Sequence, residues 1–137
     1  MPEDYPDPQE LAGFARELLQ RMGFKAQVEA GWGGDAYELK IHAGESDEVL
    51  IGRRGETLDA LQHVFAKMVS RGREELLRVR VDVSEYRQRR TSELEEHAME
   101  LARQVRETGR EVITEPMPAA ERRIIHRTLS ELPDVTT

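Results

Sequence analysis

The sequence predicts an α+β protein. Short runs in which apolar and polar residues alternate, typical of half-buried strands, are separated by segments whose apolar residues recur at helical spacing. The 137-residue length suits one domain or two small ones, and an apolar content of 38% is enough for a folded core. We therefore expect an α-β-β-α-α-β unit over residues 8–84, joined by a long helix to a second, small α/β domain.

The first helix is predicted to begin at Pro8. Asp7 is a typical N-cap, proline suits the first helical position, and Glu10 completes a capping box. Gly23 is a natural end for this helix. The residues on its apolar face are Leu11, Phe14, Ala15, Leu18, Leu19 and Met22.

Two strands are predicted next, as a hairpin. Residues 24–32 alternate strictly between apolar and other side chains, which indicates a half-buried strand. Residues 33–35, Gly-Gly-Asp, supply a turn. The returning strand carries its apolar residues at Tyr37, Leu39 and Ile41.

Two helices and a third strand complete the first domain, which we assign to residues 1–84. A short helical turn at residues 48–51 is separated by Gly-Arg-Arg-Gly, residues 52–55, from a longer helix. The inner face of that helix is formed by Leu58, Leu61, Phe65, Met68 and Val69. The final strand has Leu77, Val79, Val81 and Val83 pointing inward.

The second domain, residues 85–137, is predicted to start with the connecting helix. Ser84 is its expected cap and Gly109 its end, and Leu94, Ala98, Leu101 and Val105 form its apolar stripe. Residues 112–114 are predicted to be a short strand, and Pro118 begins a last helix that runs to about Ser130. Residues 134–137 are expected to form a strand with no visible partner.

Composition and charge exclude several classes of function. The absence of cysteine excludes disulfides, thiol catalysis and cysteine-bound zinc, and fits a reducing cytosol. No apolar run is long enough for a membrane span, and the acidic N-terminus is no signal peptide. The net charge of −7 arises in residues 1–50, which hold 4 Lys and Arg against 11 Asp and Glu, while residues 51–137 hold 16 of each.

Arginine is concentrated in one part of the chain. Residues 71–90 contain 7 arginines against 4 acidic residues, and arginine outnumbers lysine 17 to 3 overall. The planar guanidinium group suits phosphates and bases. An alternative stays open, in which these arginines form ion pairs along helices.

Gly52, Arg53, Arg54 and Gly55 form the first candidate site. Paired glycines let the backbone approach a ligand closely, and the helix that follows offers free N–H groups to a phosphate. The two arginines add ion pairing, so the loop could clamp a nucleic-acid backbone. A G-x-x-G match is weak by itself, and a plain helix–helix turn is the alternative. Its place after α-β-β and a short helix is where a type II KH fold has its GXXG loop.

The last helix contains the second candidate site. At about 100° per residue, its basic residues gather on one side, opposite the apolar ones. The basic side consists of Arg122, Arg123, His126 and Arg127, and the other side of Ile124, Ile125, Thr128 and Leu129. A merely solvated face normally mixes its charges, which favours a nucleic-acid role. His126 could donate to a phosphate or simply pack beside Ile125.

Signals for an enzyme are weak. The four histidines occupy different elements and have no metal-ligand spacing, and the chain has no P-loop, dinucleotide fingerprint or G-x-S-x-G elbow. We therefore expect no catalytic residues, no metal and no cofactor.

Three segments resemble one bacterial family. Residues 50–62, residues 80–90, and residues 115–126 followed by Pro133-Asp134-Val135 resemble the signatures of the Jag family, also called KhpB or SpoIIIJ-associated proteins. These proteins combine a type II KH domain with an R-three-H domain, named for Arg and His four positions apart, here Arg122 and His126. The family often has Tyr where Ala120 stands. Its N-terminal Jag domain is lacking here, and the chain stops at Thr137, where the family usually continues into a closing strand.

The resemblance implies a bacterial cytoplasmic protein that binds single-stranded RNA. Family members act as post-transcriptional regulators or RNA chaperones linked to cell shape and envelope control, often with a small KH-only partner (KhpA-like). The loop at residues 52–55 is then expected to hold the backbone of about four nucleotides, with Arg122 and His126 as a second contact. Neither a small-molecule substrate nor membrane insertion is expected.

A protein–protein adaptor is the alternative function. In that hypothesis the edge of the KH sheet or the long helix docks a partner, and the arginines are ion-paired. Strand edges left open by the short C-terminus also make a homodimer conceivable.

Overall fold

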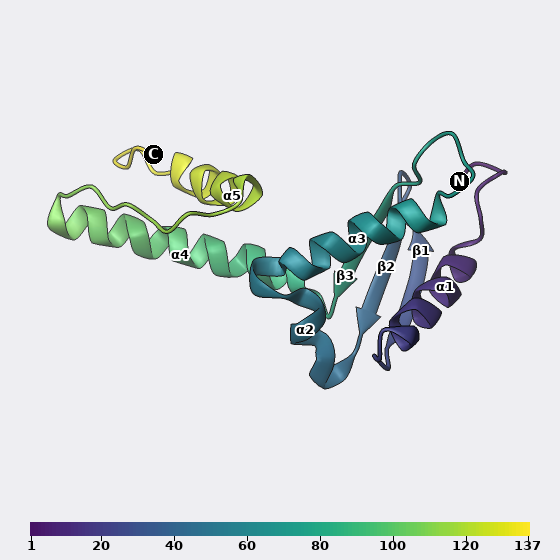
Figure 1. Ribbon diagram of the computed structural model, residues 1–137. Helices are drawn as coiled ribbons and strands as arrows, with labels where there is room; N and C mark the ends of the chain where they lie inside the picture. Colours follow the sequence, from purple (N-terminus) through teal and green to yellow (C-terminus); the bar gives the residue numbers. More distant parts are fainter. The chain divides into compact units, whose positions relative to one another are not determined.

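The computed structural model describes all 137 residues as two compact units, Met1–Arg87 (unit 1) and Gln88–Thr137 (unit 2). Unit 1 contains the sheet and the first three α-helices, and unit 2 is helical (Figure 1). The long helix α4 (Tyr86–Thr108) begins in the last residues of unit 1 and continues into unit 2. None of the helices combines the length and apolar composition that a membrane span requires.

The sheet of unit 1 has three strands, β1 (Gln27–Trp32), β2 (Tyr37–His42) and β3 (Val79–Val83), in the order β1-β2-β3. The first pair is antiparallel and the second parallel, which makes the sheet mixed. β1 begins three residues later than the alternation from Phe24 predicts. β3 likewise begins at Val79, two residues after Leu77, where its predicted alternation starts, and β2 lies where the sequence places it.

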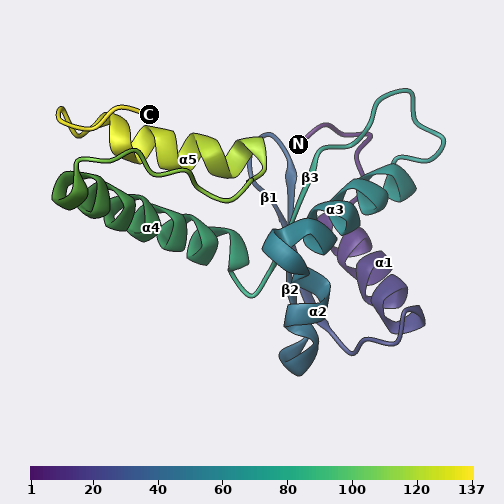
Figure 2. The same ribbon diagram turned by 60° about the vertical axis from the view of Figure 1, so that its left-hand side comes forward.

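Helices α1 (Pro8–Arg21), α2 (Asp47–Ile51) and α3 (Glu56–Val69) accompany this sheet. The order α-β-β-α-α-β is therefore confirmed for unit 1, with 3₁₀ turns at Gly44–Ser46 and Arg53–Gly55 beside α2. Asp7 caps α1 as expected, its carboxylate accepting the backbone N–H of Gln9 at 2.8 Å. Helices α1 and α3 pack on the same face of the sheet (Figures 1 and 2).

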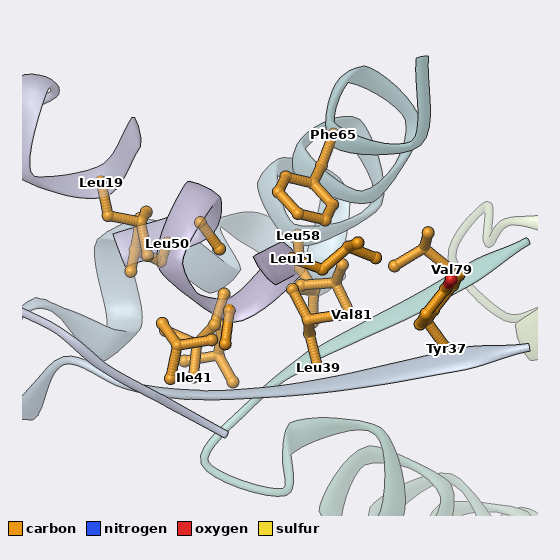
Figure 3. Close-up of a cluster of buried hydrophobic side chains, with 14 of the residues drawn as sticks. Leu11, Leu19, Tyr37, Leu39, Ile41, Leu50, Leu58, Phe65, Val79 and Val81 are labelled. Carbon is orange, nitrogen blue, oxygen red and sulfur yellow. The ribbon is translucent and has the colours of Figure 1, made fainter. Parts of the chain in front are cut away.

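The core of unit 1 lies between these helices and the sheet, and the inward side chains of the strands form part of it (Figure 3). Phe14, Met22 and Met68 were expected to face this core but are more than a third exposed. Small residues take the inward positions instead, since Ala12 and Ala66 are buried. Alanine at these positions lets the helices approach the sheet closely and leaves the larger neighbours at the rim.

The connection from β3 to α4 differs from the sequence prediction. α4 begins at Tyr86, so Ser84 does not stand at its N-cap position, and Ser84 and Glu85 both have left-handed backbones, with φ of 46° and 58°. The backbone N–H of Arg87, in the first turn of α4, is instead accepted by the Asp82 carboxylate at 3.3 Å. The hydroxyl of Ser84 donates to the Asp47 carboxylate at 2.5 Å and thereby ties this junction to the start of α2.

Unit 2 packs α4 against α5 (Ala119–Ser130) through a small core of Leu94, Ala98, Ala102, Ile125 and Leu129. Ala102 occupies the stripe of α4, where Leu101 and Val105 were predicted and are only half-buried. The strands predicted at residues 112–114 and 134–137 are wrong, because neither segment pairs with another strand. Both are irregular, so the expected α/β character of the second domain is absent.

Candidate nucleic-acid interface

The loop between α2 and α3 requires glycine at both ends. Gly52 has φ 71° and ψ −177°, a conformation essentially restricted to glycine, and a Cβ there would lie 2.9 Å from the backbone nitrogen of Thr57. Gly55 is left-handed, with φ 77°, and a Cβ there would lie 2.8 Å from Cε1 of the Tyr86 ring. The turn is closed by the Gly55 N–H, which donates to the Gly52 carbonyl at 3.3 Å.

Two arginines stand between these glycines. Arg53 is exposed, and Arg54 is half-buried with a left-handed backbone, φ 55°. The loop leads directly into the 14-residue helix α3, whose first turn has no side-chain cap. The positive end of the helix dipole therefore lies next to the arginine side chains, an arrangement that can attract a phosphate.

A groove of about 530 Å³ runs along α3, from Asp59 in its first turn onward. Its walls come from the side of α3 and from β3 with the segment before it. Arg78, Arg80 and His63 contribute basic groups, and Asp59 contributes a carboxylate. The lining is completed by Ala36, Gln62, Ala66, Leu76, Leu77 and Val79.

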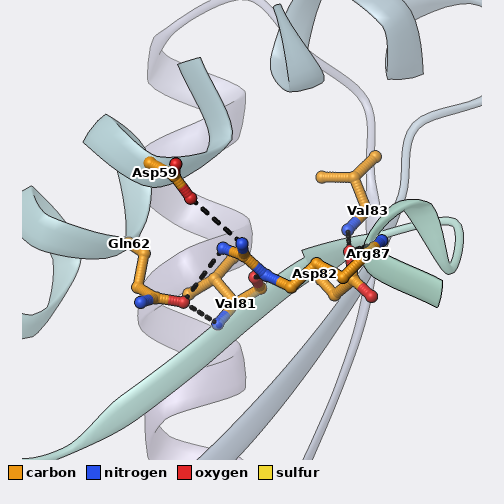
Figure 4. Close-up of polar contacts among 6 residues, drawn as sticks. All are labelled: Asp59, Gln62, Val81, Asp82, Val83 and Arg87. Carbon is orange, nitrogen blue, oxygen red and sulfur yellow. Dashed lines mark hydrogen bonds and ion pairs between the residues drawn. The ribbon is translucent and has the colours of Figure 1, made fainter. Parts of the chain in front are cut away.

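The edge of β3 next to this groove is covered by side chains (Figure 4). The Gln62 side-chain oxygen accepts the Val81 N–H at 2.8 Å, and Nε of Arg87 donates to the Val81 carbonyl at 3.1 Å. The same guanidinium donates to Gln62 at 3.2 Å and to the Asp59 carboxylate at 3.0 Å. Both backbone groups of Val81 are thus already hydrogen-bonded within the protein.

Several arginines of residues 71–90 form ion pairs, as the alternative interpretation of this segment anticipated. Arg80 donates to Asp35 at 2.7 Å and lies 3.5 Å from Glu38, and Arg73 contacts Asp4 at 2.9 Å. The hydrogen bond from Arg80 holds the pKa of the Asp35 carboxyl below its usual value. The local positive charge of this segment is therefore largely compensated on the protein itself.

Helix α5 presents the second set of predicted residues. Arg122, Arg123, His126 and Arg127 are exposed, while Ile125 and Leu129 are buried against α4. Glu121 is not part of the exposed strip; it is 7% exposed, and both of its carboxylate oxygens accept from Arg90. The exposed side of the helix is therefore cationic, as predicted from the helical spacing.

Two of these side chains contact neighbouring segments. Nη1 of Arg122 donates to the Met117 carbonyl at 2.7 Å, and Nδ1 of His126 forms a hydrogen bond with the Thr137 hydroxyl. Arg123 and Arg127 make no ion pair, and their side chains are exposed.

The predicted site residues form two groups, one in each unit. Gly52, Arg53, Arg54 and Gly55 lie together in one loop of unit 1, and the four α5 residues lie together in unit 2. The sequence did not indicate Tyr86 beneath the loop, Asp59 and Gln62 in the groove, or Arg87, which is hydrogen-bonded to both of the latter. Asp59 and Gln62 share a face of α3, but nothing in the sequence spacing connects them to Arg87. No group of His, Asp and Glu side chains that could hold a metal ion occurs in the structure.

Comparisons with known proteins match both units. An R-three-H domain model matches residues 92–137. The chain is 34% identical over 117 residues to "RNA-binding protein KhpB" of Clostridium symbiosum, which covers 85% of this chain and 53% of that protein. It is 42% identical over 87 residues to the Bacillus subtilis protein of the same name, covering 64% of this chain and 42% of the relative.

A similar match extends over nearly the whole chain. The protein named KhpB from Lactiplantibacillus plantarum is 31% identical over 127 residues, 93% of this chain and 39% of the relative. The chain thus spans about half the length, or less, of the curated relatives that it matches.

Proposed function

Because the chain belongs to the KhpB family and contains an R-three-H domain, we propose that it binds single-stranded RNA through the loop of residues 52–55 and the exposed basic side of α5. The observation that carries the proposal is the geometry of this loop. Two glycines with positive φ turn the backbone sharply between α2 and α3, and Arg53 stands exposed just before α3. The loop thereby offers a phosphate a guanidinium group beside the positive end of the α3 dipole.

Unit 1 is proposed to be a type II KH domain. Its α-β-β-α-α-β order, its mixed sheet and the place of the Gly-Arg-Arg-Gly loop between α2 and α3 support this assignment. We propose residues 1–84 as the KH domain and residues 85–137 as the R-three-H domain with its connecting helix. The groove along α3 is then the path that RNA follows away from the loop.

Phosphate contacts are proposed to supply most of the affinity. All seven aromatic residues of the chain lie in unit 1, and Tyr5, Trp32 and Tyr37 pack against one another. Tyr37 and Phe65 are buried, so few rings are available for base stacking. We expect weak sequence preference and affinity that falls steeply with added salt.

In the cell, we propose a cytoplasmic post-transcriptional regulator or RNA chaperone. This role follows the family resemblance, which also suggests a small KH-only partner. A catalytic function is not proposed.

The structure gives less support to an adaptor that pairs through the sheet edges. On β1, the Val28 carbonyl accepts from Arg16 at 3.0 Å, and the Ala30 carbonyl accepts from Gln9 at 3.3 Å. On β3, both backbone groups of Val81 are bonded to side chains. Strand addition would have to displace these contacts, which disfavours both the edge-docking hypothesis and a homodimer formed in that way.

Fluorescence anisotropy with a short labelled single-stranded RNA tests the proposal. Arg53→Asp removes an exposed cation from the loop, and Lys25→Asp makes the same charge change on an exposed residue between α1 and β1. Between about 50 and 200 mM salt, we expect the wild-type affinity to fall and Arg53→Asp to bind about tenfold more weakly than Lys25→Asp. Equal affinity of the two variants would contradict a role for the loop.

The same assay tests α5. Arg123→Asp is compared with Arg110→Asp, which changes an exposed arginine just after α4. A loss of affinity confined to Arg123→Asp supports α5 as the second contact, and equal effects of the two changes contradict it.

A further inference from the structure

We propose that Ser84, Tyr86 and Arg87 form a clasp that holds the loop of residues 52–55 in its binding conformation. This inference rests on the proposed function and adds three positioning residues to it. The clasp lies at the junction between β3 and α4, entirely within unit 1. Each of its residues contacts a different element that shapes the loop.

Tyr86 supports the loop from beneath. Its half-buried ring packs against the core of unit 1 and comes so close to Gly55 that a Cβ there would lie 2.8 Å from Cε1. Gly55 is itself buried. The ring therefore fixes how far the last residue of the loop can sink toward the core.

Ser84 fixes the helix that leads into the loop. Its hydroxyl donates to the Asp47 carboxylate, and its N–H donates to the Ile41 carbonyl at 2.9 Å. Asp47 is the first residue of α2, and its other carboxylate oxygen accepts the Ala43 N–H at 2.7 Å. The five-residue helix α2 ends at Ile51, directly before Gly52, so its anchoring determines where the loop starts.

Arg87 fixes the helix that leaves the loop. Its guanidinium contacts Asp59 and Gln62, which lie in the first two turns of α3, and Nε donates to the Val81 carbonyl (Figure 4). The clasp thus reaches α2, the loop and α3 from one short segment of chain.

Unfavourable backbone conformations in the loop and in the clasp segment explain why such support is needed. Arg54, Ser84 and Glu85 all have positive φ without being glycine, which disfavours each of these conformations in an isolated chain. Such geometry persists only where surrounding contacts enforce it. A loop held in this way needs little reordering to receive RNA, and by linkage bound RNA stabilises the first turn of α4 in return.

Amide hydrogen exchange, together with RNA anisotropy, tests the clasp in the full chain. Tyr86→Leu keeps apolar bulk but removes the ring beneath Gly55, and Tyr86→Phe is the matched control that retains the ring. We expect exchange of the Gly52 and Gly55 amides to rise about tenfold in Tyr86→Leu while the amides of β2 stay protected, with RNA affinity reduced several-fold. Tyr86→Phe, which keeps the ring, should show slower exchange of the Gly52 and Gly55 amides and tighter RNA binding than Tyr86→Leu.

The two readouts separate the clasp from the proposed function. The clasp is overturned if the Gly52 and Gly55 amides exchange at the wild-type rate in Tyr86→Leu. It is also overturned if their exchange rises only in parallel with that of the β2 amides. Where wild-type chain fails to bind RNA, the proposed function fails, yet the exchange rates still decide whether Tyr86 orders the loop. If Trp32 fluorescence shows that Tyr86→Leu does not fold, Ser84→Ala takes its place. Faster exchange of the loop amides with β2 still protected is again expected, and loop exchange at the wild-type rate again contradicts the clasp.

Discussion

Glu121 and Arg90 form a two-point ion pair that joins the first turn of α5 to α4. Nε and Nη2 of Arg90 donate to the two oxygens of Glu121 at 2.9 and 2.8 Å. Glu121 is buried and the Arg90 side chain is 27% exposed, so solvent screens the pair only partly. The apolar core of unit 2 is small, and this pair therefore forms a substantial part of what holds α5 in place.

Replacing Glu121 by Ala is expected to destabilise unit 2 selectively. The change removes both hydrogen bonds that Arg90 makes to this carboxylate and should cost about 2 kcal/mol, since Glu93 at 3.4 Å offers only partial compensation. All aromatic residues lie in unit 1, so Trp32 fluorescence reports that unit alone, whereas circular dichroism also follows α4 and α5. The helical signal should melt earlier while the fluorescence transition stays in place.

Glu95→Ala serves as the control for this prediction, because Glu95 is exposed on α4 and forms no ion pair. If Glu121→Ala and Glu95→Ala melt alike, the pair contributes nothing to the stability of unit 2.

Gly52→Ala should cost more stability than Gly72→Ala. Both glycines have positive φ, but a Cβ at Gly52 meets the backbone of Thr57, whereas nothing lies within 4 Å at Gly72. Positive φ alone costs about 1 kcal/mol, and we expect the conformation of Gly52, essentially restricted to glycine, and its contact with Thr57 to add about 1–2 kcal/mol in urea unfolding followed by Trp32 fluorescence. Equal losses would show that the loop relaxes freely around residue 52.

Unit 1 was largely predictable from sequence because its signals are local. The Asp7 cap, the alternation of β1 and the apolar valines of β3 each specify an element within a few residues. The strand predicted at residues 112–114 is wrong because a strand also depends on residues far away in the sequence. Its β-branched residues favour a strand, but a strand forms only where another strand pairs with it.

The candidate site shows the same limit. The two glycines and the basic side of α5 could be recognised from spacing alone. Tyr86 could not, because it reaches Gly55 only after β3 has paired with β2 and the chain has turned through two left-handed residues. The burial of Glu121 could not be predicted either, since it depends on Arg90, 31 positions earlier.

Asp134 should titrate below its ordinary pKa. Its carboxylate accepts two hydrogen bonds from Arg106, at 2.7 and 2.8 Å, and the hydrogen bonding lowers the pKa of Asp134 from 3.8. Because the pKa is lower in the folded state, ionised Asp134 stabilises the fold at any pH above its pKa in the unfolded chain. This contribution is lost as the pH falls through the pKa of the folded state. Carboxyl NMR titration should show the low pKa, and Arg106→Gln should return it toward 3.8; an unchanged pKa in that variant would contradict the pairing.

Gln62→Ala should expose the edge of β3. The Val81 N–H loses its acceptor, so its exchange should accelerate and unit 1 should lose about 1 kcal/mol of stability. The control is His63→Ala, which changes the exposed side chain of the next residue. It should leave exchange of the Val81 amide unchanged. Protection of Val81 that survives in Gln62→Ala would mean that another group covers this edge.

An amide NMR titration of the chain with a single-stranded RNA of about eight nucleotides tests the central claim most directly. We predict that the largest shifts fall on Gly52–Glu56 and along the groove side of α3, with a second set on α5 around Arg123 and Arg127. Binding that leaves the amides of residues 52–55 unshifted would contradict the assignment of this loop as the RNA-binding site.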